Sequence, residues 1–156
     1  MVKSGDKQNK LMLIGRYSTK VGAKGRVAVP VKFREGLGKA PIISQGYEKS
    51  LLLVERDKWE ELTGFLKNKP LTRGPARDTE RFLFGSAFEV EFDSQGRIVV
   101  PQELREFAGL SDEAVFLGLG NRVEIWSKEN WTEYDRGLKK NIEEIASKLS
   151  EQGHES

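Results

Sequence analysis

The chain contains the same short sequence twice, and this duplication is the strongest constraint on its fold. Residues 25–35 read GRVAVPVKFRE, and residues 96–106, 71 positions later, read GRIVVPQELRE. Six of the eleven positions are identical, whereas average residue usage would give roughly one. Solenoid and propeller repeats have shorter periods, of about 20–50 residues. The chain therefore holds two copies of one small module.

Each copy is too small to bury a stable core by itself. Outside the repeated block, Tyr17 corresponds to Phe88 at the same offset. Further apolar positions correspond at an offset of 72: Leu51, Leu53 and Trp59 match Val123, Ile125 and Trp131. Each copy covers about 45 residues, a size that rarely folds without a disulfide, a metal or a partner. The length of 156 residues fits one ordinary domain or two small intertwined ones, and the absence of cysteine excludes disulfides.

Local patterns predict the same strand, turn, strand and helix in both copies. In the second copy, Phe88, Val90 and Phe92 alternate with glutamates, which is typical of a half-buried strand. A turn that ends at Gly96 and a β-branched return strand follow. Pro101 then marks the start of a short helix. The first copy repeats this order.

Two hairpins and three further helices complete the predicted secondary structure. The hairpins pair residues 41–45 with 50–55 and residues 114–119 with 122–126. The helices begin at Asp57, at Ala76 and after Ser127, which is a residue type favoured at helix N-termini. We therefore expect a mainly β protein with short helices, of the α+β class.

The predicted elements divide the chain into six segments. They are a flexible basic extension (1–12), a first module (16–58), linking helices (59–86), a second module (87–130), a C-terminal helix (131–149) and a disordered tail (150–156). The C-terminal helix carries one apolar stripe, formed by Trp131, Tyr134, Leu138, Ile142, Ile145 and Leu149. This stripe packs either on the modules or on a neighbouring subunit.

Positive charge is concentrated on the first copy. Residues 15–40 hold seven basic residues and one acidic residue, whereas the matching residues 86–111 hold two basic and five acidic residues. The net charge of the whole chain, +2, hides this contrast. Charge of one sign on one module is typical of a surface that binds a polyanion. An unevenly charged, solvated surface is the alternative explanation.

The sequence has no converging set of catalytic groups. His154 is the single histidine and cysteine is absent, which excludes Cys-His and Ser-His arrangements and cysteine-ligated zinc. Glu89 and Glu91 share the outward face of one predicted strand, as solvated glutamates do. No apolar run reaches the about 18 residues of a membrane span. We expect a cytoplasmic protein that is not an enzyme and that binds no cofactor, small-molecule substrate or membrane.

The basic residues of the first copy predict a nucleic-acid interface. Lys20, Lys24 and Arg26 belong to the predicted strands and turn, and Lys32 and Arg34 to the helix that follows. A two-stranded ribbon can enter the major groove of DNA, where arginine contacts guanine or phosphate. Because the aromatic residues of this stretch occupy positions that look buried, duplex DNA is favoured over single strands.

These motifs resemble a known fold. Gly-Arg followed by three apolar residues and Pro, with Asp four residues before the Arg, is similar to the AbrB-like swapped-hairpin DNA-binding fold. Two tandem copies resemble the MraZ family of bacterial transcriptional regulators. The resemblance covers roughly residues 12–135 and rests on five segments: 12–17, 24–35, 93–101, 104–110 and 122–126.

The resemblance implies an assembly and a target. Members of the family form closed rings of identical subunits, octamers or similar, and associate with the nucleoid. They bind direct repeats of double-stranded DNA in the promoter of the division and cell-wall gene cluster, which includes their own promoter, and usually repress it. By residue-level correspondence, Arg26 is the leading DNA-contacting candidate, supported by Lys24. The other DNA-binding candidates are the basic residues Lys20, Arg16, Lys32 and Arg34.

The first copy departs from the family pattern at one position. Asp93 and Arg97 complete an Asp-x-x-x-Arg motif in the second copy, whereas Gly22 stands where the first copy would have the aspartate. A carboxylate there would pair with the arginine and cap the turn. We therefore expect Arg26 to be freer and its turn more mobile. We also expect the first copy to contact DNA and the second to support assembly.

Two other functions use the same fold. An antitoxin neutralises a partner protein, but such chains typically carry one hairpin module and a disordered tail. A structural ring or scaffold would bind no duplex DNA. The second module and the final helix favour the DNA-binding regulator over the antitoxin.

Overall fold

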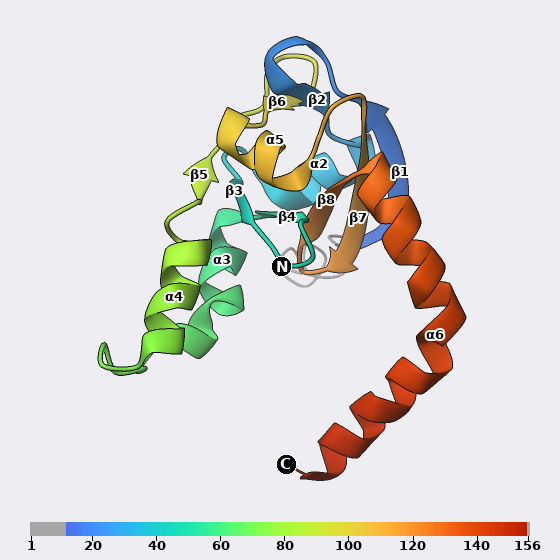
Figure 1. Cartoon of the computed structure of the whole chain (residues 1–156). Coiled ribbons are helices and arrows are strands. Elements are labelled where there is room, and N and C mark those ends of the chain that lie inside the picture. Colours follow the sequence, from blue (N-terminus) through green and yellow to red (C-terminus); the bar gives the residue numbers. More distant parts are fainter. Residues whose placement is uncertain (1–11, 156) are drawn as a thin grey trace, which may run out of the picture.

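Strands from the two copies interleave in one six-stranded sheet. The computed structural model describes residues 12–155, and side chains up to residue 152. Its larger sheet has the order β1-β7-β8-β4-β3-β5, and a separate two-stranded ribbon pairs β2 with β6 (Figure 1). The strands are β1 (Leu13–Lys20), β2 (Arg26–Ala28), β3 (Ile42–Gln45), β4 (Leu51–Val54), β5 (Phe88–Glu89), β6 (Arg97–Val99), β7 (Glu113–Gly120) and β8 (Val123–Ser127). All of these pairings are antiparallel.

The helices and short helical turns lie between these strands and at the end of the chain. They are η1 (Ala23–Gly25), α2 (Val31–Leu37), α3 (Arg56–Leu62), η2 (Gly64–Leu66), α4 (Gly74–Leu83), α5 (Gln102–Ala108) and α6 (Lys128–Glu155). The predicted α+β class and the C-terminal helix are confirmed. The predicted N-terminal extension lies outside the described residues, apart from Met12.

Helix α6 is longer than the apolar stripe predicts. The predicted cap at its start is confirmed, because the Ser127 hydroxyl accepts a hydrogen bond of 3.1 Å from the backbone N–H of Asn130. The prediction of a disordered tail is wrong for residues 150–155, since α6 continues through Glu155. No proline interrupts this segment, so backbone hydrogen bonds can propagate past the last apolar residue.

The two copies exchange strands with each other. β1 of the first copy pairs along its whole length with β7 of the second, from Leu13 opposite Gly120 to Lys20 opposite Glu113. β5 of the second copy pairs with β3 of the first. Each copy therefore completes the sheet of the other, which explains how modules of this size obtain a shared core.

β5 is shorter than the predicted alternation over residues 88–92. Only Phe88 and Glu89 pair with β3, and the backbone N–H of Val90 then donates to the carbonyl of Pro41 at 3.0 Å. Proline has no N–H to return a second hydrogen bond. The ladder therefore ends at Pro41, although Val90 is still buried.

An approximate two-fold axis relates the copies. Val27 lies opposite Ile98 in the ribbon, and Leu52 lies opposite Glu124 in the larger sheet. Each of these pairs joins corresponding positions of the two copies, at the offsets of 71 and 72. A pairing between equivalent residues is expected where a two-fold axis passes, so the axis runs through the ribbon and through the centre of the sheet.

The main core lies between the sheet, the ribbon and the two short helices that follow the ribbon strands. Its largest fully buried side chains come from both copies: Phe33, Leu37, Ile43, Leu51, Leu53, Ile98, Leu104, Phe116 and Ile125. The Tyr17 ring packs edge-on against Phe33, with centroids 5.3 Å apart. Since residues of both copies fill one core, we expect the copies to unfold together.

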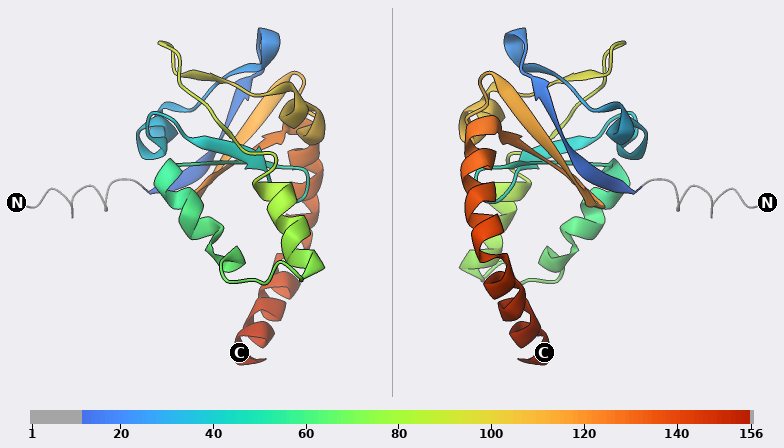
Figure 2. Two further views of the ribbon diagram at one scale, coloured as in Figure 1. Left: turned by 90° about the vertical axis from the view of Figure 1, so that its left-hand side faces the viewer. Right: turned by 90° about the vertical axis from the view of Figure 1, so that its right-hand side faces the viewer.

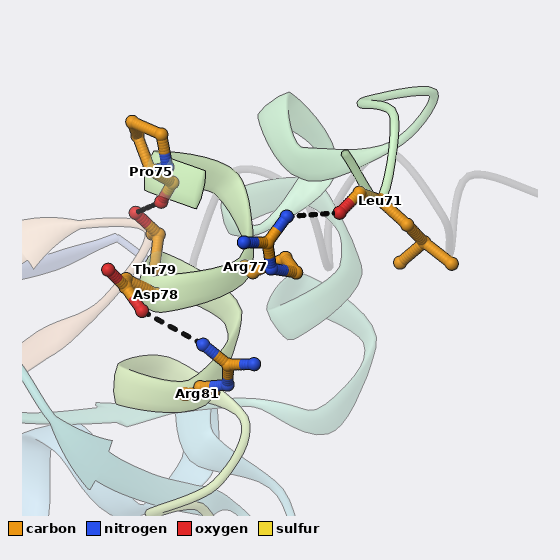
Figure 3. A network of polar contacts seen from close by, with 6 residues as sticks. All are labelled: Leu71, Pro75, Arg77, Asp78, Thr79 and Arg81. Atoms are coloured by element: carbon orange, nitrogen blue, oxygen red, sulfur yellow. Dashed lines mark hydrogen bonds and ion pairs between the residues drawn. The ribbon is translucent and has the colours of Figure 1, made fainter. Parts of the chain in front are cut away.

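Helices α3 and α4 link the copies. Trp59 of α3 and Leu83 of α4 form a smaller core with Val54 of β4 and Leu66 of η2. Figure 2 shows the two helices inclined to each other below the sheet. Figure 3 shows how α4 is held at its start, where the Arg77 guanidinium donates to the carbonyl of Leu71. Thr79 donates to the carbonyl of Pro75 at 2.7 Å. These local bonds give the linker a defined structure.

Only the first half of α6 packs on the sheet. Trp126 of β8 contacts Trp131 and Tyr134 of α6, with ring centroids 5.3 and 5.0 Å apart. Beyond these contacts the helix projects from the body of the protein (Figure 1). Ile142, Ile145 and Leu149 are 49%, 44% and 70% exposed. In the described part of the chain, no helix is long and apolar enough to span a membrane.

Glu124 is a half-buried carboxylate on the two-fold axis, and its neutral replacement is expected to stabilise the protein. Burial raises its pKa, and the hydrogen bond of 2.9 Å from the Trp126 indole opposes this only in part. Glu124→Gln keeps an acceptor for the indole and removes the buried charge. We expect the melting temperature at pH 7.5 to rise by a few degrees at most, because solvent still screens this half-buried charge.

The pH dependence of this difference follows from the direction of the shift. The pKa of Glu124 is higher in the folded protein than in the unfolded chain. As the pH falls through this raised pKa, the carboxylate of the folded wild type therefore becomes protonated. The cost of the buried charge then disappears. Melting curves of both proteins from pH 7.5 to 4 should therefore converge at low pH. A difference that grows on acidification would contradict this explanation.

Candidate nucleic-acid interface

The ribbon of β2 and β6 lies at one end of the molecule, away from the α3–α4 pair and the end of α6 (Figure 1). It is extended by two hydrogen bonds between the copies, from Val29 N–H to the Gly96 carbonyl at 3.1 Å and from Val100 N–H to the Gly25 carbonyl at 2.9 Å. Val27 and Ile98 point into the core. The alternate positions, Arg26 and Ala28 with Arg97 and Val99, therefore face outward.

The second-copy turn, which precedes β6, is closed by its aspartate. Asp93 Oδ1 accepts hydrogen bonds from the backbone N–H groups of Gln95 at 2.8 Å and Arg97 at 2.9 Å. Its Oδ2 accepts one from Arg97 Nε at 2.7 Å. The backbone N–H of Arg97 is the main cause that lowers the pKa of Asp93, and the Arg97 guanidinium lowers it further. Asp93 thus stays ionised and holds Arg97 in place.

The first-copy turn, which precedes β2, has the same backbone closure without a carboxylate. Gly22 N–H donates to the Arg26 carbonyl at 2.7 Å, as Asp93 N–H does to the Arg97 carbonyl. Lys24 adopts a left-handed conformation with φ 59°, which is uncommon for a residue with a side chain. Arg26 is exposed, and within the described residues it has no acidic partner. Both turns project from the same end of the molecule (Figure 2).

A shallow depression of about 320 Å³ lies beside the first-copy turn. Its lining residues are Lys20, Gly22, Ala23, Arg26, Ala28 and Arg97. We call this hollow the ribbon depression. It brings together cations from β1, β2 and β6, and its lining includes no carboxylate. Two of its three cations, Arg26 and Arg97, occupy equivalent positions of the two copies.

The remaining predicted DNA-binding residues lie elsewhere. Lys24 is at the tip of the first-copy turn, and Lys32 is exposed on α2. Arg16 forms an ion pair of 3.5 Å with Asp135 of α6, and its guanidinium lies 5.9 Å from the Trp131 ring. The structure therefore brings Lys20 and Arg26 together but places Arg16 against α6.

Arg34 has a structural contact that its charge did not indicate. Its Nε donates to the Val29 carbonyl at 2.8 Å, and the equivalent Arg105 donates to the Val100 carbonyl at 3.0 Å. Each arginine also covers the turn glycine of the other copy, Arg34 over Gly96 and Arg105 over Gly25. The repetition of Arg at the same place in both copies was a signal for this shared role.

Arg97 has a second position that the motif alone does not indicate. The sequence assigns it to the Asp-x-x-x-Arg motif of the second copy, and in the fold it also lines the ribbon depression together with Arg26. The repeat itself contained the signal, since strands related by a two-fold axis can pair with each other. In the described part of the chain, no group of three acidic or histidine side chains is arranged to hold a metal ion.

Comparison with known proteins identifies the family. The family model of the MraZ protein, described as antitoxin-like, matches residues 12–82 and 83–151. The chain belongs to the MraZ family. The two matched segments divide the chain as the internal repeat does, and together they include almost all of the described residues.

Relatives within the MraZ family match nearly the whole chain. The transcriptional regulator MraZ of Alkaliphilus oremlandii (strain OhILAs) is 45% identical over 142 residues, which are 91% of this chain and 99% of the relative. The transcriptional regulator MraZ of Thermoanaerobacter sp. (strain X514) is 42% identical over 140 residues, 90% of this chain and 98% of the relative. The predicted resemblance to MraZ regulators is thus confirmed.

Proposed function

We propose that the chain is a transcriptional regulator that binds specific sequences of double-stranded DNA through the ribbon end of the molecule. It binds direct repeats as a homo-oligomeric ring on the nucleoid. Its target is the promoter of a division and cell-wall gene cluster, its own promoter included, which it represses. Membership of the MraZ family and the names of its relatives support transcription regulation.

The observation that carries the DNA-binding part is the outward face of the ribbon. Arg26 and Arg97 extend from it, and Lys20 and Lys24 lie beside it. A two-stranded antiparallel ribbon fits the width of the major groove, and arginine forms paired hydrogen bonds with guanine or with phosphate. We assign base contact first to Arg26, since Arg97 is held by Asp93.

Exposed apolar side chains support self-assembly. Apart from Ile142, Ile145 and Leu149 on α6, a second group lies where β1 begins and β7 ends. This group consists of Met12, Ile14 and Leu119, and Ile14 and Leu119 are direct partners in the sheet. Exposed apolar groups of this kind on a charged surface commonly mark protein interfaces.

Charges placed on the α6 stripe are expected to break the assembly. We expect the double variant Ile142→Glu, Ile145→Glu to shift the native mass from a multimer to smaller species, because burying two carboxylates in an apolar interface is costly. Its melting temperature should change little, since both side chains are about half exposed. Ser147→Glu, on the opposite face of the helix, is the control. An unchanged mass for the double variant would exclude α6 from the interface.

One pair of measurements tests the proposed function as a whole. Selection of bound sequences from random duplex DNA should yield a recurrent short motif in direct repeats, and native mass spectrometry should give one closed multimer. Binding should weaken steeply with salt, because each bound ribbon neutralises several phosphates. Failure to retain any duplex at low salt would reject DNA regulation and favour a scaffold.

A further inference from the structure

We propose that the ribbon depression is a phosphoryl-binding site, formed by Lys20, Arg26 and Arg97 and kept open by glycine at position 22. The proposal deepens the proposed function, because the phosphoryl group that we favour is one phosphate of the DNA backbone. The site is formed by both copies, with two cations from the first and one from the second.

The two turns differ in whether a carboxylate lies beside their arginine. In the second copy, the Asp93 carboxylate holds Arg97 Nε at 2.7 Å. In the first copy, Gly22 lines the depression at the equivalent position and offers no carboxylate to Arg26. A carboxylate at residue 22 would compete with a phosphate for the guanidinium, since both are oxyanions that bind its paired N–H donors.

The charges around the depression favour an anion. Three cationic side chains line a hollow of about 320 Å³, and no acidic residue lines it. Asp93, which binds Arg97, is not among the residues that line the depression. Lys20 and Arg26 have no counter-charge in this lining and repel each other, and a bound phosphoryl group relieves that repulsion.

The backbone at Gly22 does not itself require glycine. Its φ of −88° is accessible to any residue. A Cβ added there would approach the Arg26 carbonyl oxygen at 3.3 Å, and the next atom, Arg26 Cβ, lies at 4.0 Å. A shift of a few tenths of an ångström accommodates it. Glycine at this position therefore changes the chemistry of the depression more than its fold, and an aspartate can be placed there as a test.

The first experiment measures phosphate binding by the full chain without DNA. Equilibrium dialysis with radiolabelled inorganic phosphate compares the wild type with Gly22→Asp and with the uncharged control Gly22→Asn. We expect Gly22→Asp to bind phosphate at least fivefold more weakly and Gly22→Asn to stay within about twofold of the wild type. Lys20→Gln removes one lining cation without altering the turn and should also weaken binding. Equal binding by wild type, Gly22→Asp and Lys20→Gln would overturn the proposal.

The second experiment identifies the source of the phosphoryl group. Gly22→Asp should bind a selected duplex more weakly, and the slope of log affinity against log salt should fall by about one per bound subunit. Loss of phosphate binding with unchanged DNA affinity and salt slope would support the site and overturn DNA as its source. If the wild type binds phosphate but no duplex, the site stands and the proposed function fails.

Discussion

Arg26→Ala is expected to abolish sequence-specific DNA binding. Arg26 is exposed on the outward face of the ribbon and has no acidic partner within the described residues. A bidentate arginine–guanine contact contributes about 1–3 kcal/mol, which is about 5- to 150-fold in affinity. In the proposed ring, several ribbons would bind repeated sites, so the losses would multiply. We expect at least a 100-fold loss in fluorescence anisotropy titrations with a selected duplex.

Arg97→Ala is the matched control, since it removes the equivalent arginine of the second copy. Its Nε is bound to Asp93, so its loss leaves that carboxylate with backbone partners alone. We expect a lower melting temperature and impaired assembly, with a smaller loss of DNA affinity than for Arg26→Ala. If Arg97→Ala loses DNA binding as an intact oligomer while Arg26→Ala binds normally, the roles that we assign to the two copies are reversed.

Gly25→Ala, next to the ribbon strand β2, is expected to destabilise the protein strongly. Gly25 has φ +78°, a conformation that costs about 1–2 kcal/mol for a residue with a side chain. An added Cβ would also lie 2.8 Å from the Val100 carbonyl oxygen and 2.5 Å from Arg105 Nε. These two atoms are hydrogen-bonded to each other. We therefore expect a total loss of about 2–4 kcal/mol, or about 5–15 °C in melting temperature.

Gly120→Ala separates the two causes of this loss. Gly120 has φ +92°, but a Cβ there would meet nothing within 4 Å. Its replacement therefore measures the cost of the backbone conformation alone, about 1–2 kcal/mol. The difference between the melting temperatures of Gly25→Ala and Gly120→Ala then measures the effect of crowding against Arg105. Equal melting temperatures would show that the contact with the other copy contributes nothing.

The strands and helices could be predicted because each depends on local pattern. The hairpins of β3 with β4 and β7 with β8 lie within about a residue of their predicted bounds. Ser127 caps α6 as expected. Predictions failed where a distant partner decides the outcome. Pro41, which lies far from residues 88–92 in sequence, limits β5 to two residues because it cannot donate a backbone hydrogen bond.

The candidate site could be predicted in part. The charge contrast between the copies identified Lys20 and Arg26, and both line the ribbon depression. Charge alone could not distinguish a free cation from an engaged one. Arg16 is paired with Asp135 of α6, and Arg34 donates to the Val29 carbonyl, because the fold brings acceptors to them from other elements.

The sequence by itself determined that one module occurs twice, that its strands and helices follow one order, and that Gly22 and Asp93 differ at one equivalent position. These are properties of the residues and of their spacing. Only the tertiary structure decided that the repeated segments pair with each other, as Val27 opposite Ile98, and that Arg26 and Arg97 share one depression. The physical reason is that neither copy can bury a core alone, so strands distant in sequence pair wherever burial is greatest.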